Sequence, residues 1–84
     1  MERPEGAAPP RERKLCDWLY GQILDRILRG DYPPDSRLPS EAVLGEEFNV
    51  SRPVVREALA RLREDELVQS RRGSGSYVQR KPRL

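Results

Sequence analysis

The 84-residue chain has no histidine and only one cysteine, Cys16, and these absences exclude several kinds of site. One cysteine cannot form an internal disulfide, and without histidine or a second thiol the chain lacks the ligands of a conventional zinc site. Because no histidine is present to activate it, Cys16 is interpreted as a small core or boundary side chain rather than a nucleophile. The sequence therefore predicts no metal and no cofactor.

Long apolar runs are also missing from the sequence. No stretch approaches the roughly 20 residues that a membrane-spanning helix needs, and no segment resembles the hydrophobic region of a signal peptide. We therefore expect a cytoplasmic protein that does not contact a membrane. An enzyme is also disfavoured, because without histidine or paired thiols the remaining acidic residues form no recognisable catalytic constellation.

Charge and length narrow the class of protein further. The net charge of +2 is a weak signature of nucleic-acid binding, but residues 71–84 contain five basic residues and no acidic one. The length fits one domain. Residues 1–13 contain three prolines and almost no apolar side chain larger than alanine, so we predict a disordered tail there. The domain is predicted over residues 14–79, followed by a basic tail or linker over 80–84.

A first amphipathic helix is predicted from about Lys14 to Arg29, with Gly30 as its stop. The linker after it, residues 31–37, contains two prolines and turns the chain into a short extended piece around Arg37 and Leu38. We expect this piece to pair with two later strands as the third strand of a small sheet.

Two further helices with clear start and stop residues follow. Ser40 fits the N-cap of the first, and Asn49, which tolerates a left-handed conformation, fits its end. Ser51 fits the N-cap of the second, and Pro53 falls in its first turn, where a missing N–H costs little. The second helix has one apolar stripe, made of Val55, Ala58, Leu59 and Leu62.

This arrangement of helices is typical of a helix-turn-helix, in which the second helix enters the DNA major groove by its N-terminal residues. Arg52 and Arg56 lie one turn apart at that end, and an arginine fork matches the two acceptors of guanine. The alternative is a solvated helix face that carries an i, i+4 ion pair between Glu57 and Arg61.

A hairpin is predicted after the third helix, with strands at Leu67–Arg71 and Ser76–Gln79. Its glycines let the backbone approach a phosphate or a narrow groove closely, and two arginines add positive charge beside them. The alternative is a plain surface hairpin with incidental arginines. As a DNA-binding wing, its contact residues would be Arg71, Arg72, Gly73, Ser74 and Gly75.

Three segments, ILRGDYPPDSRLPSE, NVSRPVVREALARL and RRGSGSYV, resemble in their order the N-terminal DNA-binding domain of the GntR family of bacterial transcription regulators. The resemblance covers about Leu15 to Val78. It implies an α+β winged helix-turn-helix with three helices and a small antiparallel sheet, bound to double-stranded DNA at a pseudo-palindromic operator in the bacterial nucleoid. The DNA-facing residues it implies are Ser51, Arg52, Pro53, Val54 and Arg56 in the recognition helix, Ser40 and Glu41 before it, and Arg72 and Gly73 at the wing tip.

The chain departs from the family pattern at four positions. Ala42 replaces an arginine that contacts DNA in many relatives, so that contact is in doubt. Asp35, Asn49 and Glu66 stand where glycine is usual. Asn49 imitates glycine well in a left-handed conformation and Glu66 does so poorly, so the end of the recognition helix is expected to be strained or differently capped.

Family members have a second, C-terminal domain that binds a metabolite and dimerises, and we expect this chain to lack it. The isolated chain is therefore expected to be a monomer, and a full-length protein a homodimer. The segments REALARL and RGSGSYV resemble the FadR branch, whose helical effector domains bind small organic acids. A winged helix that contacts an acidic protein partner is the remaining alternative, but Arg52, Arg56 and Arg72 offer it no apolar patch.

Overall fold

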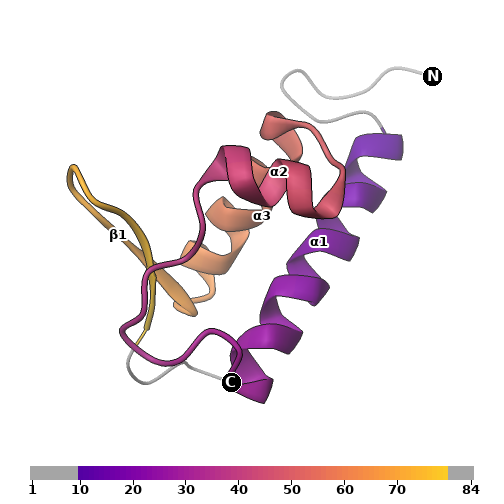
Figure 1. Ribbon diagram of the computed structural model, residues 1–84. Coiled ribbons are helices and arrows are strands. Elements are labelled where there is room, and N and C mark those ends of the chain that lie inside the picture. The colour runs from indigo at the N-terminus through magenta and orange to yellow at the C-terminus, as the bar shows by residue number, and fades with distance from the viewer. Residues whose placement is uncertain (1–9, 80–84) are drawn as a thin grey trace.

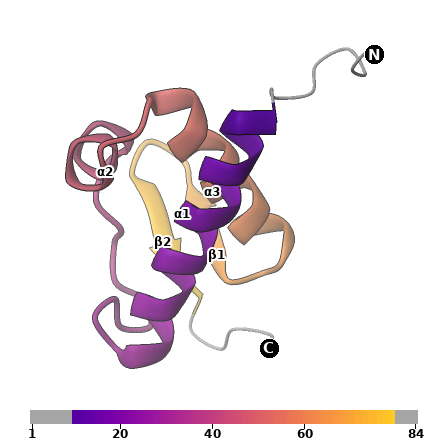
Figure 2. The same cartoon turned by 90° about the vertical axis from the view of Figure 1, so that its right-hand side faces the viewer.

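A computed structural model describes residues 10–79, which form three helices followed by a hairpin. The elements are α1 (Pro10–Arg29), α2 (Glu41–Phe48), α3 (Arg52–Glu64), β1 (Val68–Arg71) and β2 (Gly75–Val78). In Figure 1 the hairpin projects from one side of the helices, and Figure 2 shows α1 in front of α3 with the hairpin beyond it. This is the predicted α+β winged helix-turn-helix.

The first helix begins earlier than the sequence indicated. Its first residue is Pro10 rather than Lys14, so residues 10–13, assigned to the disordered tail, are helical. Proline suits the first position of a helix, because its missing N–H has no partner there in any case. The remainder of the predicted tails, residues 1–9 and 80–84, lies outside the described residues.

The core lies between α1 and α3 and is closed by residues from α2, the linker and the hairpin. Cys16 is 1% exposed, which confirms its interpretation as a core residue. No helix within residues 10–79 has both the length and the apolar character needed to span a bilayer. The buried side chains are Cys16, Leu19, Ile23, Ile27, Leu38, Leu44, Val54, Val55, Ala58, Leu59, Leu62, Leu67, Val68 and Val78.

All three helices end in the same way. Each is followed by a residue with positive φ, which is +89° at Gly30, +56° at Asn49 and +61° at Glu66. In each case the residue after this one donates its N–H to a carbonyl in the last turn, as in a Schellman motif, and at α3 one further residue, Asp65, precedes Glu66. These bonds are Asp31 N to Arg26 O, Val50 N to Gly45 O and Leu67 N to Leu62 O, each 2.9 Å long.

The predicted helix starts are confirmed in part. Ser40 precedes α2 in an extended conformation, and its hydroxyl accepts from the Val43 N–H at 3.2 Å. Ser51 occupies the equivalent position before α3, but its side chain makes no capping hydrogen bond, so that expectation was wrong. Pro53 lies in the first turn of α3, as predicted. Its ring leaves one fewer N–H for a serine cap to satisfy.

The hairpin is an antiparallel pair in which Val68 lies opposite Val78 and Arg71 opposite Gly75. β2 begins at Gly75, one residue before the predicted start. The expected third strand is reduced to a single bridge between Arg37 and Tyr77. Hydrogen bonds on both sides of this bridge hold the linker to β2, from Leu38 N to Ser76 O at 2.8 Å and from Val78 N to Ser36 O at 2.9 Å.

Candidate nucleic-acid interface

The N-terminal turns of α3 present two exposed guanidinium groups. Arg52 is exposed, and the Arg56 side chain is 62% exposed with Nη2 3.5 Å from Oε1 of Glu41. An exposed pair at this distance contributes less than about 1 kcal/mol, so Arg56 is free to exchange Glu41 for another acceptor. At 100° per residue, Arg52, Arg56 and Arg63 fall within about 40° of one another around the helix axis. These three arginines therefore share one face.

Val54 does not belong to that face. Its side chain is 2% exposed and packs in the core, so the prediction that it contacts DNA was wrong. The Cys16 thiol of α1 lies 3.8 Å from the carbonyl of Val54, which places this position against the first helix. The apolar side of α3 is thus wider than the predicted stripe, because α3 is covered on more than one side.

Ser40 and Glu41 lie where α2 begins, next to the arginine face of α3. The Ser40 hydroxyl is already used as a helix cap, although the residue stays exposed. The carboxylate of Glu41 meets Arg56 across the two helices. The structure therefore brings these two predicted residues to the recognition helix, where Glu41 pairs with Arg56.

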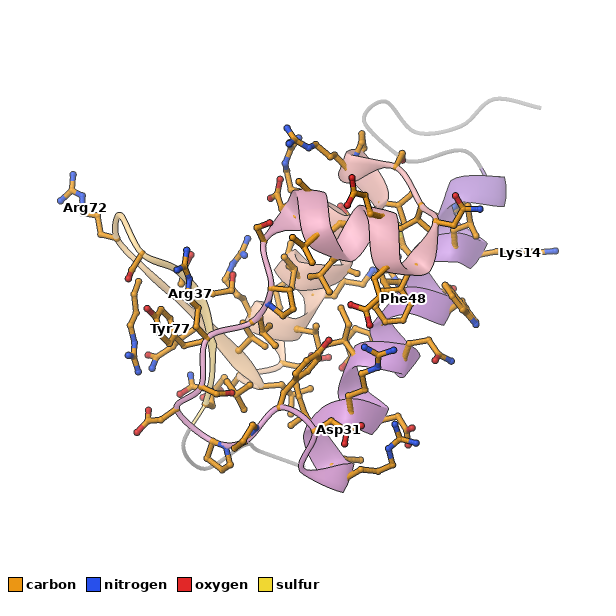
Figure 3. The ribbon with its side chains drawn as sticks, in the orientation of Figure 1. Lys14, Asp31, Arg37, Phe48, Arg72 and Tyr77 are labelled. Atoms are coloured by element: carbon orange, nitrogen blue, oxygen red, sulfur yellow. The ribbon has the colours of Figure 1, made fainter. Side chains whose placement is uncertain are left out.

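The wing tip is a tight turn with open space around it. Ser74 N donates to Arg71 O at 2.9 Å, and φ is +73° at Gly73 and +117° at Gly75. A Cβ added at Gly73 would meet no atom within 4 Å, so this glycine is required by its conformation and not by crowding. Arg72 projects from the end of the wing, away from the helices (Figure 3).

Arg71 has a different position from Arg72. Its guanidinium lies 4.0 Å from the centroid of the Tyr77 ring, and Nη2 is 3.1 Å from Oδ1 of Asp35. The Tyr77 hydroxyl in turn is 2.8 Å from Oγ of Ser74. Arg71 therefore connects the wing to the linker before α2, whereas the tip cation is Arg72.

A groove of about 270 Å³ separates α3 from the wing. Two arginines that were not among the predicted contact residues, Arg37 and Arg63, line it together with Glu41. One signal for Arg63 was present in the sequence, since it follows Arg56 at i+7 and so shares its helix face. Arg37 gave no such signal, because only the tertiary structure brings the linker beside the wing. The remaining lining residues are Leu38, Pro39, Ser40, Leu59, Ser70, Gly75 and Ser76.

The opposite side of α3 is fixed to α1 by polar contacts. Arg61 pairs with Asp17 of α1 and lies 3.7 Å from Glu57, so the i, i+4 pair named in the alternative interpretation of this helix is present. The Tyr20 hydroxyl donates to the Asp65 carboxylate, and this hydrogen bond, with burial, raises the pKa of Tyr20 to about 12. Within residues 10–79 no three acidic or cysteine side chains are grouped to hold a metal ion.

A family described as bacterial regulatory proteins, gntR family, matches residues 15–78. The chain belongs to the gntR family. The mannosyl-D-glycerate transport/metabolism system repressor MngR of Escherichia coli K12 is 48% identical over 64 residues, which cover 71% of this chain and 27% of MngR. The chain thus spans about a quarter of the length of this relative. The expected relation to the FadR branch stays a prediction.

Solved structures show the same fold. Streptococcus agalactiae GntR is 33% identical with a TM-score of 0.69, over 76% of this chain and 31% of that one. The DNA-binding domain of AraR in complex with operator ORR3 is 29% identical with a TM-score of 0.73, over 93% of this chain and 92% of that one. The AraR domain in that complex therefore corresponds to nearly all of the chain.

Proposed function

We propose that residues 14–79 bind double-stranded operator DNA, with the N-terminal end of α3 in the major groove and the wing at the minor groove. The observation that supports this most directly is the likeness to the AraR domain bound to its operator, over nearly the whole of both chains. In this binding mode α3 and the wing are the two elements that enter the DNA grooves. The arginine face lies on α3, and the exposed cation Arg72 lies at the tip of the wing. The protein acts, on this proposal, at nucleoid DNA in the bacterial cytoplasm.

The roles of the residues follow from their positions. Arg52 and Arg56 read base edges or bind flanking phosphates, because they project from adjacent turns at the leading end of the helix. Ser51 and Pro53 are exposed beside them and approach the DNA backbone. Glu41 pairs with Arg56 in the free chain, and Arg56 exchanges this carboxylate for an acceptor on the DNA.

The wing contributes fewer side chains to the DNA contact than α3 does, and its backbone approaches the DNA more closely. Arg72 enters or borders the minor groove, and the adjoining turn of Gly73, Ser74 and Gly75 presents a backbone with little side-chain bulk. Arg71 supports this tip through Asp35 and Tyr77. Two wings and two recognition helices, in a homodimeric full-length protein, would engage the two halves of a pseudo-palindromic operator.

The test is selection of duplexes from a random library at low salt, followed by titration of the selected duplex with wild-type and variant chains. We expect Arg56→Ala to cost about 1 to 3 kcal/mol of binding free energy and to relax the preference at one base pair. Arg29→Ala is the matched control, because it removes an arginine from α1, where it pairs with Asp25 and Asp31. Equal affinity and equal selectivity in wild type, Arg52→Ala and Arg56→Ala would contradict the proposal.

A further inference from the structure

Arg37 and Arg63 come from distant segments of the chain but line the same groove between α3 and the wing. Both are exposed, and within residues 10–79 neither makes an ion pair. One acidic residue, Glu41, lines the groove too, and its carboxylate is offset by Arg56 at 3.5 Å. Among the described residues, the groove is therefore a hollow of net positive charge with two guanidinium groups that make no ion pair there.

The position of Arg37 is determined by the wing. Its backbone bridges to Tyr77, and a Cβ added at Gly75 would lie 3.2 Å from its Nε. The guanidinium thus packs over wing backbone that only glycine leaves bare, and Figure 3 shows Arg37 beside the wing. Arg63 faces the groove from the other side, about 10.5 Å further along α3 than Arg56, at 1.5 Å per residue. Arg63 is therefore too far from the leading end of α3 to share the role of Arg56.

DNA geometry explains what this groove receives. A major groove and the minor groove next to it are separated by one sugar–phosphate strand. If α3 occupies the first and the wing the second, that strand must pass between them, where the groove lies. From this we infer, on the basis of the proposed function, that Arg37 and Arg63 bind the phosphates of that strand from its two sides. A guanidinium is suited to the task, because its parallel N–H groups match two phosphate oxygens.

The experiment is a salt titration of DNA binding by the 84-residue chain, using the selected duplex and an unrelated duplex. Arg37→Gln and Arg63→Gln should each weaken binding to both duplexes equally and reduce the slope of log affinity against log salt by about 1. Arg37→Lys and Arg63→Lys should have the wild-type slope, because the slope depends on the number of phosphates that the protein neutralises and lysine has the same charge as arginine. Arg29→Gln, which removes the same charge from α1, should leave slope and affinity unchanged, and thermal melting of each variant checks its fold.

The possible results separate this inference from the proposed function. If wild type binds duplexes with a salt-dependent affinity and both glutamine variants keep the wild-type slope, the inference is wrong and the proposed function stands. A change in base preference in Arg63→Gln would also overturn it, because the residue would then read bases. A third result would also overturn the inference. If inorganic phosphate bound saturably through both arginines, and their substitution left DNA binding unchanged, the groove would be a site for a free anion. Failure of wild type to bind any duplex would refute the proposed function itself.

Discussion

Replacing Glu66 by glycine should stabilise the domain, although the change removes a side chain. Glu66 follows α3 with φ +61°, and a left-handed conformation costs a residue with a Cβ about 1 to 2 kcal/mol. Glycine avoids that cost but gives up about 0.5 to 1 kcal/mol of conformational entropy on folding. Around the middle of both ranges, the difference is a gain of roughly 0.5 to 1 kcal/mol in the free energy of unfolding. For a domain of this size, that corresponds to a rise in Tm of about 2 to 8 °C.

The assay is urea and thermal unfolding followed by circular dichroism, with Glu64→Gly as the matched control. Glu64 is the last residue of α3, two positions earlier, and it is exposed as Glu66 is. Both variants lose one carboxylate from the same end of the helix, so the net charge of the chain changes equally in the two. Glu64→Gly should destabilise by about 0.5 to 1 kcal/mol, because glycine is a poor helix residue. The two substitutions therefore have opposite expected signs.

A loss of stability in Glu66→Gly as large as that in Glu64→Gly would refute this reasoning. It would mean that the side chain of Glu66 contributes more through its contacts than its backbone conformation costs. Gly30→Ala offers a second check, since φ is +89° there and a Cβ would meet no atom within 4 Å. Its expected destabilisation of about 1 kcal/mol would come from the backbone alone.

Three further predictions concern the α1 contacts and the assembly of the protein. The pKa of Tyr20 is raised from 10.0 to about 12, so its contribution to stability is complete below pH 10 and is lost as the pH rises to about 12. In wild type the free energy of unfolding should therefore fall over this pH window. Tyr20→Phe should make that fall smaller. Arg26 bonds Glu47 and Tyr32 and lies 4.6 Å from the Phe48 ring centroid. Arg26→Met should therefore lower the free energy of unfolding in urea by about 1 to 2 kcal/mol. Arg29→Met, at an exposed arginine, should change it by less than about 0.5 kcal/mol. The 84-residue chain should sediment as a monomer, and fusion to an unrelated dimeric domain should raise its affinity for the operator by a factor of about 10² or more. A stable dimer of the chain alone, or no gain in affinity on fusion, would contradict this.

Features that depend on a few neighbouring residues were predictable from the sequence. The cap at Ser40, the left-handed turn at Asn49 and the position of Pro53 each follow from the local backbone preferences of one residue type. The apolar stripe of α3 follows from helical periodicity in the same way. The unusual backbone at Glu66 was also foreseeable, because a position that needs positive φ carried a residue with a Cβ.

Features that depend on packing between distant segments were not predictable. Val54 is one residue from the predicted stripe, and its burial results from the way α1 crosses α3. Arg71 adjoins Arg72 in the sequence, yet only Arg71 meets Asp35 and Tyr77. Charge pattern alone cannot separate such a pair, because the partner of Arg71 lies in a linker more than thirty residues earlier.

The wing combines a fixed base with an open tip, and its contacts explain how. A two-stranded hairpin is marginally stable on its own, so its direction must come from what its base touches. Val68 and Val78 are buried at that base, and β2 is bonded to the linker that leads into α2. The linker leads directly into α2, and α2 packs with α3. The base of the wing and the recognition helix therefore belong to one packed unit. The tip at Gly73 lies beyond those contacts, with open space around it, so in the proposed binding mode the tip meets the minor groove while the base of the wing stays packed with α3.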